Sequence, residues 1–197
     1  MKEKTNVGKT TLHLAEEEGN EVLVKLSLEN GAEKDSADNY GIRPIHDTAN
    51  AAVARMLLDA EADAHSPDIF DETPLLSAAW RDDGEVVELL LEHKANVDAQ
   101  DDQGRTALHR AVSCKRVEII STLLRNSANA NLQDIEMKTP LHEALLSRDV
   151  GIVATLLEYG AEPSLDILRK SRSDSTRPSR EEETLMAAQE KPNGKRT

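Results

Sequence analysis

The sequence predicts an all-α fold, a solenoid in which short helix-turn-helix units stack side by side. A similar segment recurs five times, at offsets of 33, 30, 33 and 33 residues. Each copy is followed by apolar residues at helical spacing. The chain also has only four aromatic residues, so its core must be built from Leu, Ile, Val and Ala, which is typical of packed helices.

The recurring segment carries the start of a helix. Its five copies are Gly8–His13, Gly41–His46, Asp71–Leu76, Gly104–His109 and Met137–His142. Four copies place a Thr where its hydroxyl can cap free backbone N–H groups, namely Thr10, Thr73, Thr106 and Thr139. Three place a Pro at the first helical position, where its missing N–H costs nothing: Pro44, Pro74 and Pro140. These residues predict where the first helix of each unit begins.

A second helix follows in each unit. Pairs of apolar residues recur four positions apart, as in Ile119-Ile120 and Leu123-Leu124, and predict one apolar stripe that a neighbouring unit must cover. The second unit lacks three residues around positions 48–52. We therefore expect a shorter first helix or a tighter turn there, without loss of stacking, because each unit needs only its two neighbours.

This pattern resembles the ankyrin repeat, which has a period of 33 and a Thr-Pro-Leu-His signature. The resemblance covers residues 6–165 and implies an ankyrin-repeat solenoid of five repeats, at about 6–38, 39–68, 69–101, 102–134 and 135–165. It also implies a β-hairpin-like loop before each first helix, with a positive φ at Gly8, Gly41, Asp71, Gly104 and Met137. We expect strain of about 1 kcal/mol at Met137, because side chains disfavour that conformation.

The sequence therefore divides into an ankyrin repeat domain, residues 1–165, and a charged tail, residues 166–197. The tail has a net charge of +2, against −15 for the rest of the chain. Its composition predicts disorder over most of its length. A capping box at Ser179 and Glu182, before Leu185–Ala188, predicts a short helix at 180–190. That helix either docks on repeat five, whose outer face has no obvious cover, or stays frayed.

Charge and composition exclude several classes of function. A net charge of −13 argues against nucleic-acid binding, which depends on Lys and Arg, and favours a protein partner with a basic surface. No apolar run approaches the roughly 20 residues that span a bilayer, so no membrane association is expected. Cys114 is the only cysteine, and residues 1–6 lack the apolar stretch of a secretory signal. We expect a monomer in the cytoplasm or the nucleus.

No catalytic, metal or cofactor site is predicted, and the chain is not expected to be an enzyme. Val7–Thr11 resembles the end of a phosphate-binding loop, but Glu3 stands where that loop needs Gly. Asp98–Gly104 lacks the Gly of a calcium loop. Cys114 has no oriented base. Four histidines occupy the same place in separate repeats, which favours structural hydrogen bonds over a shared metal ion: His13, His46, His109 and His142.

The ankyrin resemblance implies a concave surface made by the hairpin tips and the first helices, with recognition at positions that stacking leaves free. Tyr40, Phe70 and Trp80 fall at such positions, and aromatic residues dominate binding hot spots. The predicted partner-binding residues are Tyr40, Ile42, Ile69, Phe70, Glu72, Trp80, Arg81, Asp102 and Arg105. The alternative is that the aromatic rings pack locally over the tight turn of repeat two.

The function that these observations predict is a non-catalytic protein–protein interaction module, an adaptor or scaffold that binds its partner through the hairpins and first helices. The acidic residues Glu72, Asp82 and Asp102 are expected to favour a basic partner. The alternative is a structural or inhibitory subunit that contacts a larger assembly through the uncapped repeat five.

Overall fold

The computed structural model describes residues 4–163, so the predicted helix at 180–190 and the rest of the tail lie outside the described residues. Within this range the chain forms ten helices and no β-strand. The helices are α1 (Thr11–Glu17), α2 (Glu21–Glu29), α3 (Pro44–Asp47), α4 (Ala51–Asp59), α5 (Pro74–Arg81), α6 (Gly84–Glu92), α7 (Ala107–Ser113), α8 (Val117–Arg125), α9 (Pro140–Leu146) and α10 (Val150–Glu158). The predicted all-α solenoid is confirmed.

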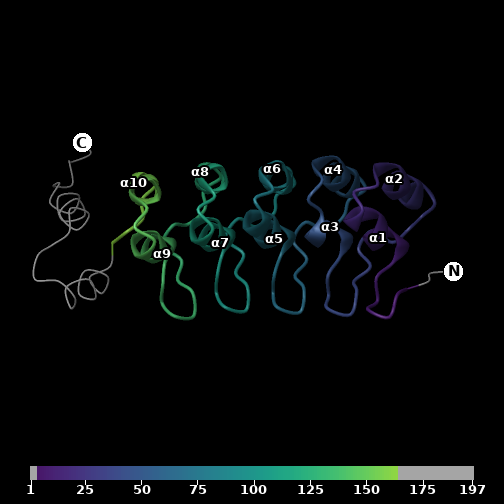
Figure 1. Ribbon diagram of the computed structural model, residues 1–197, viewed down its shortest axis with the longest axis horizontal. Coiled ribbons are helices and arrows are strands. Elements are labelled where there is room, and N and C mark those ends of the chain that lie inside the picture. Colours follow the sequence, from purple (N-terminus) through teal and green to yellow (C-terminus); the bar gives the residue numbers. More distant parts are fainter. Residues whose placement is uncertain (1–3, 164–197) are drawn as a thin grey trace, which may run out of the picture.

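The helices form two rows (Figure 1). The odd-numbered helices make an inner row and the even-numbered helices an outer row, and the five hairpin-like loops hang side by side below the inner row. The core lies between the two rows and runs without a break from Leu12 to Ala161. Within α8, Ile119, Ile120 and Leu123 are at most 1 % exposed, as the predicted apolar stripe requires. Each repeat therefore buries its apolar face only with the help of its neighbours.

The inner helices begin where the sequence predicts, but the capping differs between repeats. Thr10 and Thr106 are N-caps whose hydroxyls accept from the backbone N–H groups of His13 and His109. The histidine Nδ1 atoms accept in return from the Thr backbone N–H groups, at 3.1 and 3.2 Å. Thr73 makes no such cap, and its buried hydroxyl has no partner. Leu76 stands in place of the histidine there, so the return hydrogen bond to the Thr73 backbone N–H is missing as well.

Repeat two has a four-residue inner helix, α3, which confirms the predicted shortening. Arg81, at the end of α5, compensates for the missing turn from one side. Its Nη1 donates to the His46 carbonyl at 2.9 Å and its Nη2 to the Thr48 carbonyl at 3.1 Å. From the other side, α1 contributes Glu16, which is only 4 % exposed and approaches Thr48. We refer to Glu16, Thr48 and Arg81 as the repeat-two plug.

The hairpin-like loops are joined in a row by single backbone hydrogen bonds of 3.0–3.1 Å. The donor–acceptor pairs are Asn39–Val7, Ile69–Tyr40, Asp102–Phe70 and Ile135–Gln103. All five predicted positions have a positive φ, including Asp71 at 58° and Met137 at 61°. A side chain at Gly41 or Gly104 would lie 3.0–3.1 Å from the backbone of the next hairpin, a tight contact that favours glycine in addition to the positive φ.

Candidate protein-binding surface

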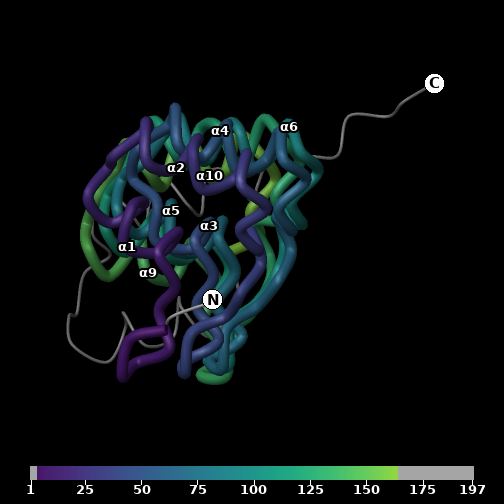
Figure 2. Tube along the Cα trace, turned by 90° about the vertical axis from the view of Figure 1, so that its right-hand side faces the viewer, coloured from purple at the N-terminus to yellow at the C-terminus, as the bar shows by residue number. Residues whose placement is uncertain are grey.

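The hairpins and the inner helices share one side of the molecule, which we call the inner face. A view along the stack shows the hairpins extending below the helical rows (Figure 2). The chain passes from each hairpin directly into an inner helix, as Asp71 and Glu72 lead into α5. Every repeat therefore presents two kinds of position on the inner face, one at its hairpin tip and one at the far end of its inner helix.

The structure brings Tyr40, Ile69 and Phe70 together at the hairpin tips. The Ile69 N–H donates to the Tyr40 carbonyl at 3.1 Å, which holds the second and third hairpins side by side. The three side chains are 51, 60 and 52 % exposed. Side chains packed over the turn of repeat two would be more buried than this. We call these three residues the tip cluster.

Trp80 is 56 % exposed and lies at the far end of α5. At a rise of 1.5 Å per residue, the helix separates it from Thr73 by roughly 10 Å. The hairpin arm adds further distance between Thr73 and Phe70. Trp80 is therefore a separate exposed aromatic residue and does not belong to the tip cluster.

Two of the predicted binding residues are engaged within the protein. Arg81 holds the repeat-two plug, and its Nε pairs with Asp83 at 2.7 Å. Glu72 accepts a hydrogen bond from the Ser77 hydroxyl at 2.7 Å and pairs with Arg110 at 3.1 Å. Both side chains are thus held by the stack, which sequence reasoning did not foresee.

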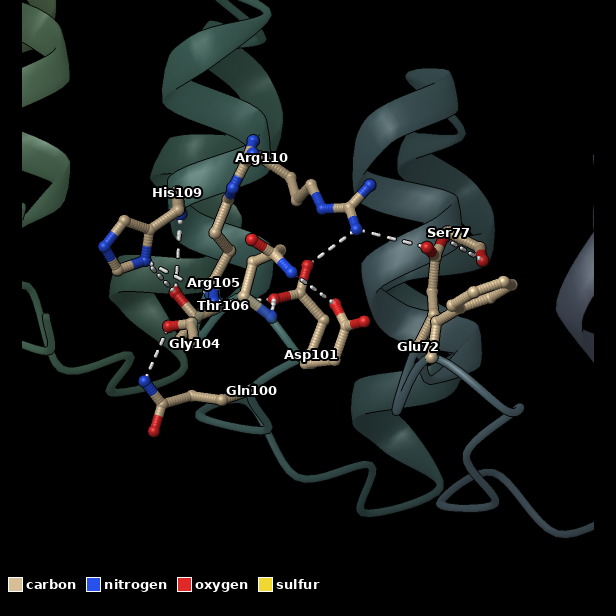
Figure 3. Close-up of polar contacts among 12 residues, drawn as sticks. Glu72, Ser77, Gln100, Asp101, Gly104, Arg105, Thr106, His109 and Arg110 are labelled. Carbon is tan, nitrogen blue, oxygen red and sulfur yellow. Dashed lines mark hydrogen bonds and ion pairs between the residues drawn. The ribbon is translucent and has the colours of Figure 1, made fainter. Parts of the chain in front are cut away.

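Arg110 forms the centre of an ion-pair network between repeats three and four (Figure 3). It pairs with Asp101 at 2.7 Å as well as with Glu72, and the Asp101 side chain is only 2 % exposed. Burial disfavours the charged guanidinium, but the two carboxylates outweigh it and raise the pKa of Arg110 above its ordinary value. The charge of Glu72 is offset only in part, because Arg110 is shared with Asp101. The exposed Asp82 carboxylate pairs with Arg116 at 3.0 Å.

The remaining predicted residues differ in exposure. Ile42 is half-buried, and its carbonyl faces His13 Nε2 at 3.0 Å. Asp102 is exposed beside the tip cluster, where its N–H donates to the Phe70 carbonyl. Arg105 is half-buried near Glu143. Burial raises the pKa of Glu143, and the charge of Arg105 offsets this rise only in part.

Further exposed apolar residues lie on the inner face outside the predicted set. Ile135 and Met137 are each 65 % exposed at the fifth hairpin tip, and Leu146 is 75 % exposed at the α9 position that matches Trp80 in α5. Their place in the repeat is the sequence signal that could have identified them. The apolar character of the inner face therefore extends to repeat five, although the aromatic residues of the predicted set lie only in repeats two and three.

The histidines support the hairpins. His13 Nε2 faces the Ile42 carbonyl, and His109 Nε2 faces the Lys138 carbonyl at 3.1 Å, so each connects its helix to the next hairpin. Burial lowers the pKa of His46 and of His109, which favours the neutral imidazole. Among residues 4–163, no group of three or more His, Cys, Asp or Glu side chains could hold a metal ion. In the same range, no helix has the length and apolar character needed to cross a membrane.

Comparison with known families agrees with this architecture. The sequence model of a family described as "Ankyrin repeats (3 copies)" matches residues 48–134 and 75–167, which together make up more than half of the chain. The first match begins at Thr48, where repeat two is shortened. A search of the curated proteins found no match.

Proposed function

This chain belongs to the ankyrin repeat family, whose members are generally protein–protein interaction modules, and we propose that it binds a partner protein through the inner face of repeats two and three. The observation that carries the proposal is the exposure of Tyr40, Ile69, Phe70 and Trp80, each more than half exposed at a position that stacking leaves free. Exposed apolar clusters on a folded protein mark interaction sites. No step of the proposed function is catalytic.

The partner contacts two points in this proposal. The tip cluster holds one apolar anchor and Trp80 holds a second at the far edge of the inner face, so one partner surface spans the hairpins and the inner helices. Ile42, Asp102 and Arg105 lie between or beside these anchors. Glu72 and Arg81 shape the surface from within the stack and are not free to meet a partner charge.

A basic partner surface is supported by the charge around the tip cluster. Asp71 and Asp102 are exposed at the third and fourth hairpin tips. Residues 1–165 also carry a net charge of −15, which attracts a basic partner over longer distances. Glu72 and Asp82 contribute less to this attraction, because Arg110 and Arg116 offset part of their charge. The basic character of the partner therefore concerns the tips more than the inner helices.

The remaining parts of the proposal concern the whole chain. Residues 1–165 form the ankyrin repeat domain and residues 166–197 a separate tail, and the protein acts as a monomeric adaptor in the cytoplasm or the nucleus. The single half-buried Cys114 is consistent with a reducing compartment. The alternative role, a structural or inhibitory subunit that contacts an assembly through repeat five, is supported by the exposure of Leu146 and Val150.

The proposal is tested by affinity capture with the full chain, identification of the partner by mass spectrometry, and measurement of Kd with purified variants. Replacing Tyr40, Phe70 and Trp80 by Ala is expected to raise Kd by at least about 30-fold, the effect of losing one hot spot of about 2 kcal/mol. The matched control replaces three exposed apolar residues of the outer row, Val22, Leu26 and Val117, by Ala. Equal Kd values for both triple variants and the wild type would reject the inner face as the site.

A further inference from the structure

The outer side of repeat five is incompletely covered. Four of its residues are half-buried, whereas the matching residues of repeat four are at most 8 % exposed. The matching pairs are Leu145 and Val112, Val153 and Ile120, Thr155 and Thr122, and Leu157 and Leu124. Repeat four is covered by repeat five, so the difference marks the surface that a further element would bury. We call Leu145, Val153, Thr155 and Leu157 the repeat-five face.

The length and starting point of the remaining chain supply one candidate for this cover. Thirty-four residues, 164–197, follow Pro163, which lies five residues beyond the end of α10. The segment therefore begins beside the repeat-five face, and an attached segment has an effective concentration in the millimolar range. A second copy of the chain at micromolar concentration competes poorly with it.

The sequence of residues 179–191 suits this role. Ser179 and Glu182 form a capping box, and Leu185, Met186 and Ala188 provide apolar side chains before Pro192. A helix over 180–190 would be roughly 16 Å long, close to the roughly 13 Å of α10. Alone it falls below the 12 to 15 or so residues that an isolated helix needs, so its formation depends on docking.

The reach of the chain agrees with the same occupant. Fifteen residues separate Pro163 from Ser179, and such a connection can extend to about 50 Å. Neighbouring helices pack only about 10 Å apart. The basic charge of this part of the chain lies beside the proposed helix, because residues 164–178 and 192–197 each have a net charge of +2, whereas residues 179–191 have a net charge of −2. The docking therefore depends on the apolar side chains of residues 179–191 and not on their charge.

We infer that residues 179–191 dock as a helix on the repeat-five face and cap the stack. Leu185 and Met186 bury their side chains against Leu145, Val153 and Leu157. This places an intramolecular cap where an ankyrin stack would otherwise continue, and it removes repeat five from contact with other proteins.

Hydrogen exchange of the full chain tests the docking. The test variant carries Leu185→Asp and Met186→Asp, and the matched control carries Ser173→Asp and Ser175→Asp, which add the same charge outside the proposed helix. Amides of α10 from Ile152 to Leu157 are expected to exchange roughly tenfold faster in the test variant than in the wild type or the control, a change equivalent to about 1.4 kcal/mol. Amides of α2, at the other end of the stack, serve as the internal reference.

Equal α10 protection in all three proteins would overturn the inference. Protection that rises with protein concentration would overturn it as well, because it would assign the repeat-five face to a second copy of the chain. The α2 amides separate a local loss of the cap from a general loss of stability, so the test variant remains interpretable. Unchanged α2 exchange in all three proteins confirms that the stack is intact.

Discussion

Glu16 is the residue whose environment differs most from that of its counterparts in other repeats. Ala79 and Val112 fill the same position in repeats three and four and are fully buried. Burial raises the pKa of Glu16 to about 8, the negative charge of Asp47 adds to the rise, and a hydrogen bond to Thr48 opposes it. The carboxyl group is therefore mainly protonated in the folded protein at neutral pH. A charged form would be present in the unfolded chain under the same conditions.

This difference makes stability depend on pH. The folded pKa of Glu16 lies above the unfolded value of 4.5, so its contribution is complete below pH 4.5 and is lost as the pH rises through about 8. At about 1.4 kcal/mol per pKa unit, the difference between 4.5 and about 8 corresponds to a loss on the order of 5 kcal/mol. Glu16→Gln is expected to remove this loss. Urea denaturation of both proteins at pH 5, 7 and 9 measures it.

The exposed neighbour Glu18 provides the control for this measurement. Glu18→Gln changes the net charge by the same amount but is expected to leave the pH dependence of unfolding as it is in the wild type. If Glu16→Gln and Glu18→Gln showed the same dependence between pH 5 and pH 9, the burial of the Glu16 carboxyl would not govern stability in that range.

At the scale of single residues, the sequence predicted a structural feature correctly where one position determines that feature by itself. The positive φ at Met137 followed from its alignment with Gly104. The space around the Met137 side chain could not be predicted from this alignment. Gly104 faces the backbone of the next hairpin, whereas the described residues contain no hairpin beyond the one that carries Met137. At Met137 the conformational cost of the positive φ is therefore the only cost that the described residues indicate.

At the scale of the helices, α3 is the element that depends most on others. It has four residues, and the carbonyl groups of His46 and Thr48 would lack donors at its end without Arg81. Hydrogen bonds to charged groups contribute about 1.5–3 kcal/mol, and unpaired buried carbonyls cost a similar amount. Arg81→Ala is therefore expected to lower the free energy of unfolding by about 2–3 kcal/mol. Chemical denaturation measures the loss, and hydrogen exchange is expected to place it in α3 and α4.

An exposed arginine on α4 provides the comparison. Arg55→Ala is expected to change the free energy of unfolding by less than about 0.5 kcal/mol, because substitutions at exposed positions usually do. If the two arginine variants were equally stable, Arg81 would have to be returned to the set of residues free to meet a partner.

The shortening of α3 was predictable because three residues are missing from a regular period. The response of the neighbouring helices was not, because Glu16 and Arg81 lie 32 and 33 residues from Thr48 in the sequence. Periodicity identifies which positions face the next repeat. It does not identify which long side chain crosses into a gap. For the same reason Arg81 was predicted as a binding residue, although the structure shows it holding α3.

At the scale of the whole molecule, the stack is strongest in the middle. Repeats three and four have full-length helices, well-buried stripes and the Arg110 network between them. Repeat one is more polar, with Val24 as the only buried residue of α2, and repeat two depends on its plug. In a linear array, stability is a sum over repeats and their interfaces. Amides of α1–α4 are therefore expected to exchange faster than those of α5–α8.

Hydrogen exchange of the wild-type chain at increasing denaturant measures this order. Helices α5–α8 are expected to open only with global unfolding, and α1–α4 to open in a separate, earlier step. A single cooperative step that includes all described helices would show that the repeat-two plug joins the first two repeats to the rest as firmly as the interface between repeats three and four.

The candidate site was predictable in part at this scale. The repeat register located the exposed positions correctly for Tyr40, Ile69, Phe70 and Trp80, which the structure leaves more than half exposed. The repeat register did not predict that Trp80 lies apart from the tip cluster, because the distance between them depends on the angle and length of α5. It also did not identify the ion pairs that Glu72 and Asp82 make with Arg110 and Arg116, because these pairs join different repeats.

The repeat-two plug also bears on how this chain could have changed through evolution. With three residues missing from repeat two, the carbonyl groups of His46 and Thr48 lack donors unless Arg81 is present. If those three residues were restored, the buried Glu16 side chain would lose the space that it occupies. The effect of the three-residue deletion therefore depends on Arg81 and Glu16, and the deletion and these two residues are best inherited together. Transplanting repeat two alone into another ankyrin array would separate it from both residues, so the transferable unit of this protein is three repeats long.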